Sequence, residues 1–188
     1  MKIYSYVVDH DTGYAPNPDF GLCTLCRCKF RKSGERRKNI VELAKKGDWV
    51  LGTGGASKRS AGNGKLIYAM RVDKTPTRED YYRHFSKRRR DNEPPGNDFE
   101  KHKQFALISR HFYYFGARAI DVQKFNLEKN SRGFHYVDPA DFCRFVEWLE
   151  RTYKRGKRGE PCQPFDKPKA SKRCGAQSRE DRLCRSNC

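Results

Sequence analysis

The stretch from Ala44 to Val72 constrains the fold most, because it places a glycine-rich loop between two apolar runs. The first run is Trp49 to Leu51, and the second is Leu66 to Met70. Glycine lets the backbone turn freely and lets a ligand or a second chain segment approach closely. Five glycines lie between the two runs: Gly52, Gly54, Gly55, Gly62 and Gly64. The pattern therefore predicts a strand, a loop and a second strand.

Three further segments are expected to be strands, because they are rich in the aromatic and β-branched residues that favour extended backbone. They are residues 3–8, 105–109 and 112–115. On an extended backbone, His111, Tyr113 and Phe115 would face one side of the last strand, and Phe112 and Tyr114 the other. One side must be core, and the other could be an aromatic wall on which a base stacks, or it could be buried as well.

Three segments are expected to be helices. Apolar residues recur at helical spacing in residues 36–46, with basic residues on the other face. The sequence from Thr77 to Asp80 resembles a capping box and predicts a short helix that continues to Phe85. Asp138 and Pro139 are suited to the N-cap and the first turn of a final helix.

These elements predict an α+β fold, a small, curved and mostly antiparallel β-barrel with flanking helices. With 188 residues and 36% hydrophobic content, the chain can bury one core. We expect that domain to span residues 1–150. In residues 151–188 apolar periodicity stops and twelve Lys or Arg accompany four acidic residues, which predicts a basic, cysteine-containing and disordered tail.

The charge of the chain indicates what it binds. A net charge of +18 favours a polyanionic partner, because Lys and Arg that neutralise phosphates release counterions. We therefore expect a nucleotide or a nucleic acid as the partner, although a basic, solvated surface with no such partner would have the same composition. No apolar run approaches the roughly 20 residues of a membrane helix, and the N-terminus does not resemble a secretory signal. This predicts a cytoplasmic protein with no membrane partner.

Three cysteines, Cys23, Cys26 and Cys28, lie within six residues and have three interpretations. They could hold a metal, but a fourth ligand at a regular spacing is missing. Cys23 or Cys28 could be a thiolate nucleophile, because neighbouring cations lower a thiol pKa, and His10 or His111 could then be its base. They could also be inert. No sequence motif specifies a cofactor, and neither a Walker loop nor a nucleophile elbow is present.

Several separated segments together resemble the second type of nucleotide-modification-associated domain, a family of phages and bacteria. The matching segments are Tyr14–Pro18, Gly21 with Cys23–Leu25 and Cys28–Lys29, Gly47–Val50 with Gly52–Gly54, Leu66–Met70, and Leu107–Ser109 leading to Phe112–Gly116. The resemblance covers residues 1–150 and implies a role beside DNA base-modification enzymes. The order of helix, Gly-Asp-Trp-Val, glycine loop and aliphatic strand is also similar to the EVE and ASCH branches of PUA-like barrels, which bind RNA or modified bases.

Two functions are favoured by this resemblance, and a third, a structural partner within a base-modification complex whose basic face docks onto an acidic protein, is also compatible with it. The first is a module that binds a nucleotide or an extruded modified base between Trp49, the backbone of residues 52–54, and Tyr113 or Tyr114. The second is an enzyme that processes a nucleotide or base. The candidate ligand-binding residues are Asn17, Thr24, Lys29, Trp49, Gly52, Thr53, Gly54, Ser109, Tyr113 and Tyr114, and the candidate catalytic residues are Cys23, Cys28 and His111.

Overall fold

The computed structural model of the chain describes residues 1–26, 30–33, 36–57, 60–85, 89, 91, 105–127 and 133–163, and of residues 30–33 and 36–38 the backbone alone. Cys28 and Lys29 therefore lie outside the described residues, as do residues 164–188, the larger part of the expected tail.

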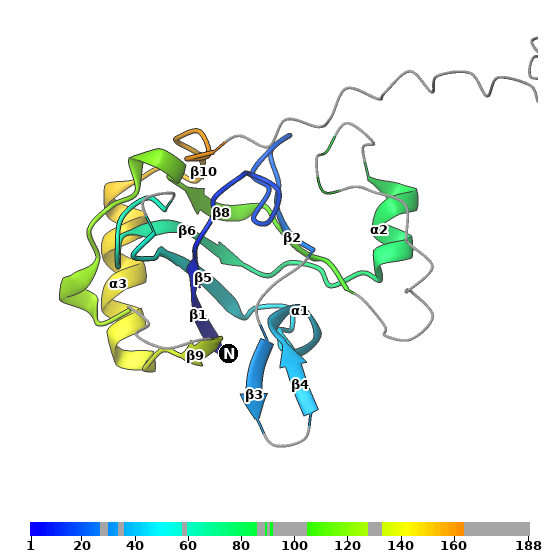
Figure 1. Cartoon of the computed structure of the whole chain (residues 1–188), viewed down its shortest axis with the longest axis horizontal. Coiled ribbons are helices and arrows are strands. Elements are labelled where there is room, and N and C mark those ends of the chain that lie inside the picture. Colours follow the sequence, from blue (N-terminus) through cyan, green and yellow to red (C-terminus); the bar gives the residue numbers. More distant parts are fainter. Residues whose placement is uncertain are drawn as a thin grey trace, which may run out of the picture.

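A six-stranded mixed sheet forms the centre of the molecule (Figure 1). Its order is β10-β8-β6-β5-β1-β9, with β1 at Ile3–Val8, β5 at Trp49–Gly54, β6 at Leu66–Arg71, β8 at His111–Tyr114, β9 at Phe134–Tyr136 and β10 at Gly156–Lys157. β5 runs parallel to β1, and β10 runs parallel to β8, whereas the other neighbours are antiparallel. The α+β class is confirmed. The expected barrel is not formed by the described residues, because β10 and β9 end the sheet without pairing to each other.

Both faces of the sheet are buried, so its central strands alternate between two cores. Helix α3 (Pro139–Thr152) covers one face, where Phe142, Phe145 and Leu149 pack against Trp49 and Tyr113. This explains the apolar spacing in the helix. Asp138 accepts hydrogen bonds from the backbone amides of residues 140 and 141, and the predicted start of the helix is confirmed.

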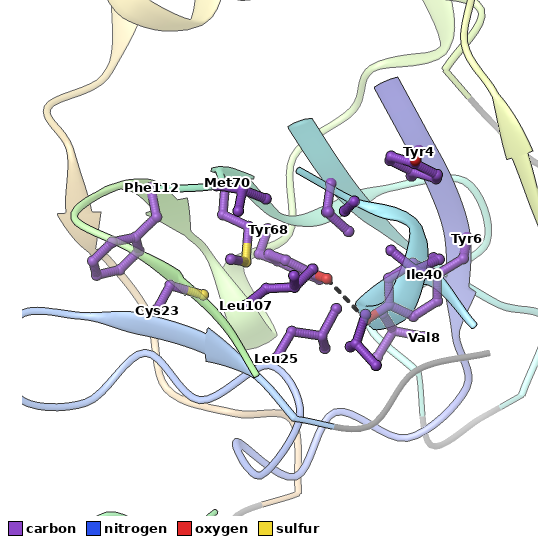
Figure 2. Packing of buried hydrophobic residues seen from close by; sticks show 14 of the residues in the cluster. Tyr4, Tyr6, Val8, Cys23, Leu25, Ile40, Tyr68, Met70, Leu107 and Phe112 are labelled. Atoms are coloured by element: carbon purple, nitrogen blue, oxygen red, sulfur yellow. Dashed lines mark hydrogen bonds between the residues drawn. The ribbon is translucent and has the colours of Figure 1, made fainter. Parts of the chain in front are cut away.

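Shorter elements cover the other face (Figure 2). These are helix α1 (Ile40–Leu43) and an antiparallel ribbon of β2 (Cys23–Leu25) and β7 (Leu107–Ser109). Helix α2 (Arg78–His84) packs on the far side of the ribbon, against Cys26, Ala106 and Ile108. A hairpin of β3 (Phe30–Ser33) and β4 (Arg36–Asn39) and the short 3₁₀ segments Gly116–Arg118 and Gln123–Phe125 complete the described elements.

The helix expected over residues 36–46 is wrong for most of its length. Residues 36–39 form β4, and the helix includes only Ile40–Leu43. Asn39 is its N-cap: the Asn39 side chain accepts a hydrogen bond from Val41 N at 3.1 Å, and Glu42 Oε2 accepts one from Asn39 N at 3.4 Å. This capping box starts the helix after the basic residues, which are left to pair as a hairpin.

Regular secondary structure continues past residue 150, where we expected the domain to end. α3 runs across that boundary to Thr152, and β10 then pairs with β8 at Tyr113 and Tyr114. Residues 151–163 are therefore part of the fold. None of the helices in the described ranges is long and apolar enough to cross a membrane.

Candidate functional site

A row of residues crosses four neighbouring strands on the face of the sheet that β2 and β7 cover. Tyr6 is opposite Gly52, Gly52 is opposite Tyr68, and Tyr68 is opposite Tyr114. All three tyrosines are buried, and Tyr68 donates a hydrogen bond to the hydroxyl of Tyr6 at 2.9 Å (Figure 2). The row places phenolic hydroxyl groups inside an otherwise apolar layer.

Asp11 continues this polar row beyond Tyr114. The Tyr114 hydroxyl donates to Asp11 Oδ1 at 2.6 Å, and the backbone amide of Cys162 donates to Asp11 Oδ2 at 3.2 Å. Burial raises the pKa of the Asp11 carboxyl, and these hydrogen bonds oppose that effect. The contact also ties the segment after β10 to the loop after β1.

A second polar cluster, the Arg89–Asp91 network, lies between the ribbon and α2. The side chains of Arg89 and Asp91 are 1% and 0% exposed, and Arg89 Nε lies 3.5 Å from Asp91 Oδ1. Four described side chains donate hydrogen bonds to the Asp91 carboxylate: Asn17 Nδ2 at 3.0 Å, Tyr81 OH at 2.9 Å, Cys26 Sγ at 3.2 Å, and Thr24 Oγ1. Arg78 donates to the Asp91 backbone carbonyl at 3.0 Å.

The Arg89 guanidinium joins the same groups from the other side. Nε donates to Tyr81 OH at 2.7 Å, and Nη2 donates to Thr24 Oγ1 at 2.8 Å and to the Asn17 carbonyl at 3.0 Å. Nη1 donates to the Asp19 carbonyl. Buried polar groups need such partners, because in a medium of low dielectric an unpaired charge is costly. Two parts of the chain that are far apart in sequence, one from Asn17 to Cys26 and one that includes α2, Arg89 and Asp91, therefore meet at one buried ion pair.

The alternating direction of side chains along β2 explains why Thr24 and Cys26 belong to the network. Cys23 and Leu25 point into the core beneath the six-stranded sheet, so Thr24 and Cys26 face α2. Asn17 is paired with Thr24 through two backbone hydrogen bonds of 2.9 Å. The network thus brings together two of the predicted ligand-binding residues, Asn17 and Thr24.

The cysteines of β2 and the residue after it are buried thiols. Burial raises the pKa of Cys23 well above its usual range, and Arg89 nearby opposes this only in part. Burial and the neighbouring Asp91 also raise the pKa of Cys26. Both residues are therefore protonated at neutral pH and are poor nucleophiles. Among the described residues, no group of three or more His, Cys, Asp or Glu side chains is arranged to hold a metal ion.

Trp49, Tyr113 and His111 lie on the other face of the sheet, beneath α3. Trp49 is buried, and its ring centroid lies 5.1 Å from that of His111 and 5.3 Å from that of Phe142. His111 Nε2 lies 3.0 Å from Glu150 Oε1. The sheet separates Trp49 and Tyr113 from Tyr114 and from the Arg89–Asp91 network. The version of the expected pocket that pairs Trp49 with Tyr114 is therefore not assembled from one face, and the version that pairs Trp49 with Tyr113 stays a prediction.

The glycine loop packs on itself. Gly54 N donates to the Lys65 carbonyl at 2.7 Å, and Gly64 N donates to the Gly54 carbonyl at 3.0 Å. Gly55 N donates to Ser60 Oγ at 2.7 Å. Thr53 Oγ1 donates to the Tyr6 carbonyl at 3.5 Å, and Ser109 Oγ donates to the His111 carbonyl at 2.8 Å, so these candidates also have internal partners.

Sequence reasoning missed Arg89 and Asp91. Both lie in a charged, proline-bearing stretch that is typical of a solvated loop. Their distance in sequence from Asn17, more than seventy residues, gives no local signal of the contact. Within the network, Tyr81 and Arg78 of α2 lie nearest to Arg89 and Asp91 along the chain.

The family model of the nucleotide modification associated domain 2 matches residues 1–103 and residues 84–168. The two matches together span the sheet, the ribbon, the Arg89–Asp91 network and α3. A search of curated proteins gave no match, and a search of solved structures also gave none.

Proposed function

Because the chain belongs to the nucleotide modification associated domain 2 family, we propose that it binds a nucleotide or a modified base for a phage or bacterial nucleotide-modification system. Base-modification enzymes are the protein partners that this role implies. The observation that supports a binding role is the Arg89–Asp91 network, a buried ion pair surrounded by an amide, two hydroxyl groups and a thiol.

The chemistry of these groups suits a nucleobase. A carboxylate accepts hydrogen bonds from amino and imino N–H groups, an amide both donates and accepts, and a guanidinium donates to carbonyl oxygens or phosphates. In this proposal the base replaces Thr24 and Tyr81 as a donor to the Asp91 carboxylate, and it meets the Asn17 amide that now donates to Asp91. The polar edge of the ligand would then meet fixed donors and acceptors.

The energetics of burial also support a role beyond packing. Replacing a buried ion pair by apolar residues of similar volume is often neutral or stabilising, so such a pair is weak evidence for stability alone. Here the pair lies where two loop segments meet α2, outside the apolar centre of the sheet. Its burial at this place is better explained by recognition of a polar ligand.

Binding is favoured over catalysis by a thiolate at Cys23 or Cys26. Both thiols are buried and have raised pKa values, so neither supplies the ionised nucleophile that the enzymatic alternative needs. The version of that alternative that uses Cys28 concerns a residue outside the described ranges and stays a prediction.

The proposal is tested by calorimetric titration of the purified chain with nucleoside monophosphates that carry unmodified and modified bases. We expect at least one to bind, and Asn17→Ala and Asp91→Asn to weaken that binding about tenfold or more, because hydrogen bonds to charged groups contribute about 1.5–3 kcal/mol. His111→Gln is the matched control, a polar residue on the opposite face of the sheet. Absence of binding to the native chain contradicts the function, and unchanged binding in both variants contradicts the site.

A further inference from the structure

Phe20 is an exposed aromatic residue on a backbone conformation that bulky residues rarely adopt. Its side chain is 60% exposed, and its φ of 58° lies in the left-handed region. Gly21 follows with a φ of 72°, so two successive residues have positive φ. Turns of this kind normally carry Gly, Asn or Asp in the position that Phe20 occupies.

The turn is held in place from the interior. Arg89 donates hydrogen bonds to the carbonyl groups of Asp19 and Asn17, and Leu22 N donates to the Asp19 carbonyl at 3.4 Å. An unfavourable backbone conformation persists only where the surrounding structure determines it. The Arg89–Asp91 network therefore fixes a turn that presents the Phe20 ring to solvent.

A basic edge lies next to this turn. Lys157, in the edge strand β10, has its Nζ atom 3.2 Å from Asp19 Oδ1, and Figure 1 shows β10 close to the loop that follows β1. Arg158 Nη1 donates to the Lys154 carbonyl at 3.3 Å, which keeps these two exposed cations adjacent. Arg118 is also exposed and lies beside Gly159, with its Cβ atom 3.6 Å from the position of a Cβ on that glycine.

We propose that Phe20 and the basic edge formed by Arg118, Lys154 and Arg158 bind single-stranded nucleic acid. Proteins that bind single strands combine cations along the backbone with aromatic rings on which bases stack. The exposed ring of Phe20 needs an unpaired base, since both faces of a base in a duplex are covered by its neighbours. This surface goes beyond recognition of a single nucleotide, because it binds the strand that carries the base.

The role of Phe20 is tested by fluorescence anisotropy with a labelled single-stranded oligodeoxythymidylate. Phe20→Gly should weaken binding at least about fivefold by removing one stacking interaction, and Phe20→Trp should retain it. Glycine is suited to the positive φ, so Phe20→Gly should unfold at a denaturant concentration no lower than the native chain. Tyr136→Ala, which removes an aromatic side chain that is 43% exposed, should bind like the native chain.

The basic edge is tested by comparing two double variants of equal charge. Lys154→Ala with Arg158→Ala should lower the slope of log affinity against log salt by about 0.7 for each phosphate that the variant no longer neutralises. Lys45→Ala with Lys46→Ala removes two exposed cations between α1 and β5 and should leave the slope nearly unchanged. Equal reductions of the slope in the two variants overturn the proposal in favour of diffuse charge.

Two other results would also overturn it: native affinity in Phe20→Gly, or tighter binding to a duplex of the same sequence that is insensitive to Phe20. Titration of Phe20→Gly with mononucleotides separates this inference from the proposed function. Retained mononucleotide binding with reduced binding to the oligonucleotide supports the surface. Loss of mononucleotide binding as well assigns Phe20 to the nucleotide site and overturns a separate strand-binding surface.

Discussion

The ring of Tyr68 occupies the space that a side chain on Gly52 would need. A Cβ atom on Gly52 would lie 2.2 Å from Tyr68 Cε1 and 2.5 Å from Tyr68 Cδ1. The two residues are opposite each other on β5 and β6, and Tyr68 extends from this position to the hydroxyl of Tyr6. One glycine of the loop-flanking stretch is thus required by close packing of a tyrosine, not by a turn or a ligand.

We predict that Gly52→Ala destabilises the fold by about 1–3 kcal/mol, because the added methyl group must displace the buried Tyr68 ring. Urea denaturation of the two proteins gives the difference in free energy of unfolding. The same substitution in a Tyr68→Ala background should cost less, because the ring is gone and only the contact with Val8 Cγ2, at 2.8 Å, remains. Equal costs in both backgrounds would show that the clash with Tyr68 is not the cause.

The ion pair of Arg89 and Asp91 should behave as one energetic unit. Asp91→Leu alone leaves a buried guanidinium without its carboxylate and should cost about 3–5 kcal/mol, and Arg89→Met alone should cost a similar amount. The double variant should cost clearly less than the sum, because it leaves no unpaired charge. Denaturant titrations of the four proteins measure this coupling, and additive effects would contradict it.

His111 should make stability depend on pH. Burial and the nearby Arg155 lower the pKa of His111 from 6.5, although Glu150 opposes them. A lowered pKa means that the unfolded chain binds a proton at His111 more readily than the folded chain does. The contribution of His111 to the free energy of unfolding is therefore present above pH 6.5 and is lost as the pH falls through the pKa of the folded state. His111→Gln should therefore lose less stability than the native chain on mild acidification. Parallel stability curves for the two proteins would refute this.

The buried cysteines should resist alkylation. Cys23 and Cys26 are buried with raised pKa values, whereas Cys143 on α3 is exposed. Brief treatment of the native protein with iodoacetamide, followed by mass spectrometry, should modify Cys143 and leave Cys23 and Cys26 unmodified. Denaturation before treatment is the control and should expose all three. Rapid alkylation of Cys23 in the folded protein would support the mechanism in which Cys23 is a thiolate nucleophile.

Much of the sheet could be predicted from local pattern. The strands at residues 3–8, around Trp49 and at residues 66–70, and the starts of α2 and α3, follow from propensity and capping signals that act over a few residues. The helix predicted over residues 36–46 is wrong for most of its length. The apolar spacing of Ile40, Leu43 and Ala44 is compatible with a helix of one buried turn as well as with a helix of three turns. The pairing of β10 with β8 could not be predicted from the sequence, because β10 contains only two residues and is too short to have a recognisable pattern.

The candidate site could be predicted only in part. Asn17 and Thr24 lie in the network, but Arg89 and Asp91 join them through contacts across more than sixty residues, which no periodicity encodes. Successive side chains of a strand point to opposite faces of the sheet, and this alternation places Tyr113 and Tyr114 on different sides. Alternation does not indicate that both faces are covered, and this burial removes the exposed aromatic wall from β8.

The central claim, that a nucleotide binds at the Arg89–Asp91 network, is tested most directly by an NMR titration of the native chain with the nucleotide that calorimetry selects. The reporters are the Arg89 Nε–H and the Trp49 indole N–H, which lie on opposite sides of the six-stranded sheet. We predict that the Arg89 signal shifts in a saturable way while the Trp49 signal stays in place. A saturable shift of Trp49 with Arg89 unmoved, or no shift of either, would contradict the claim.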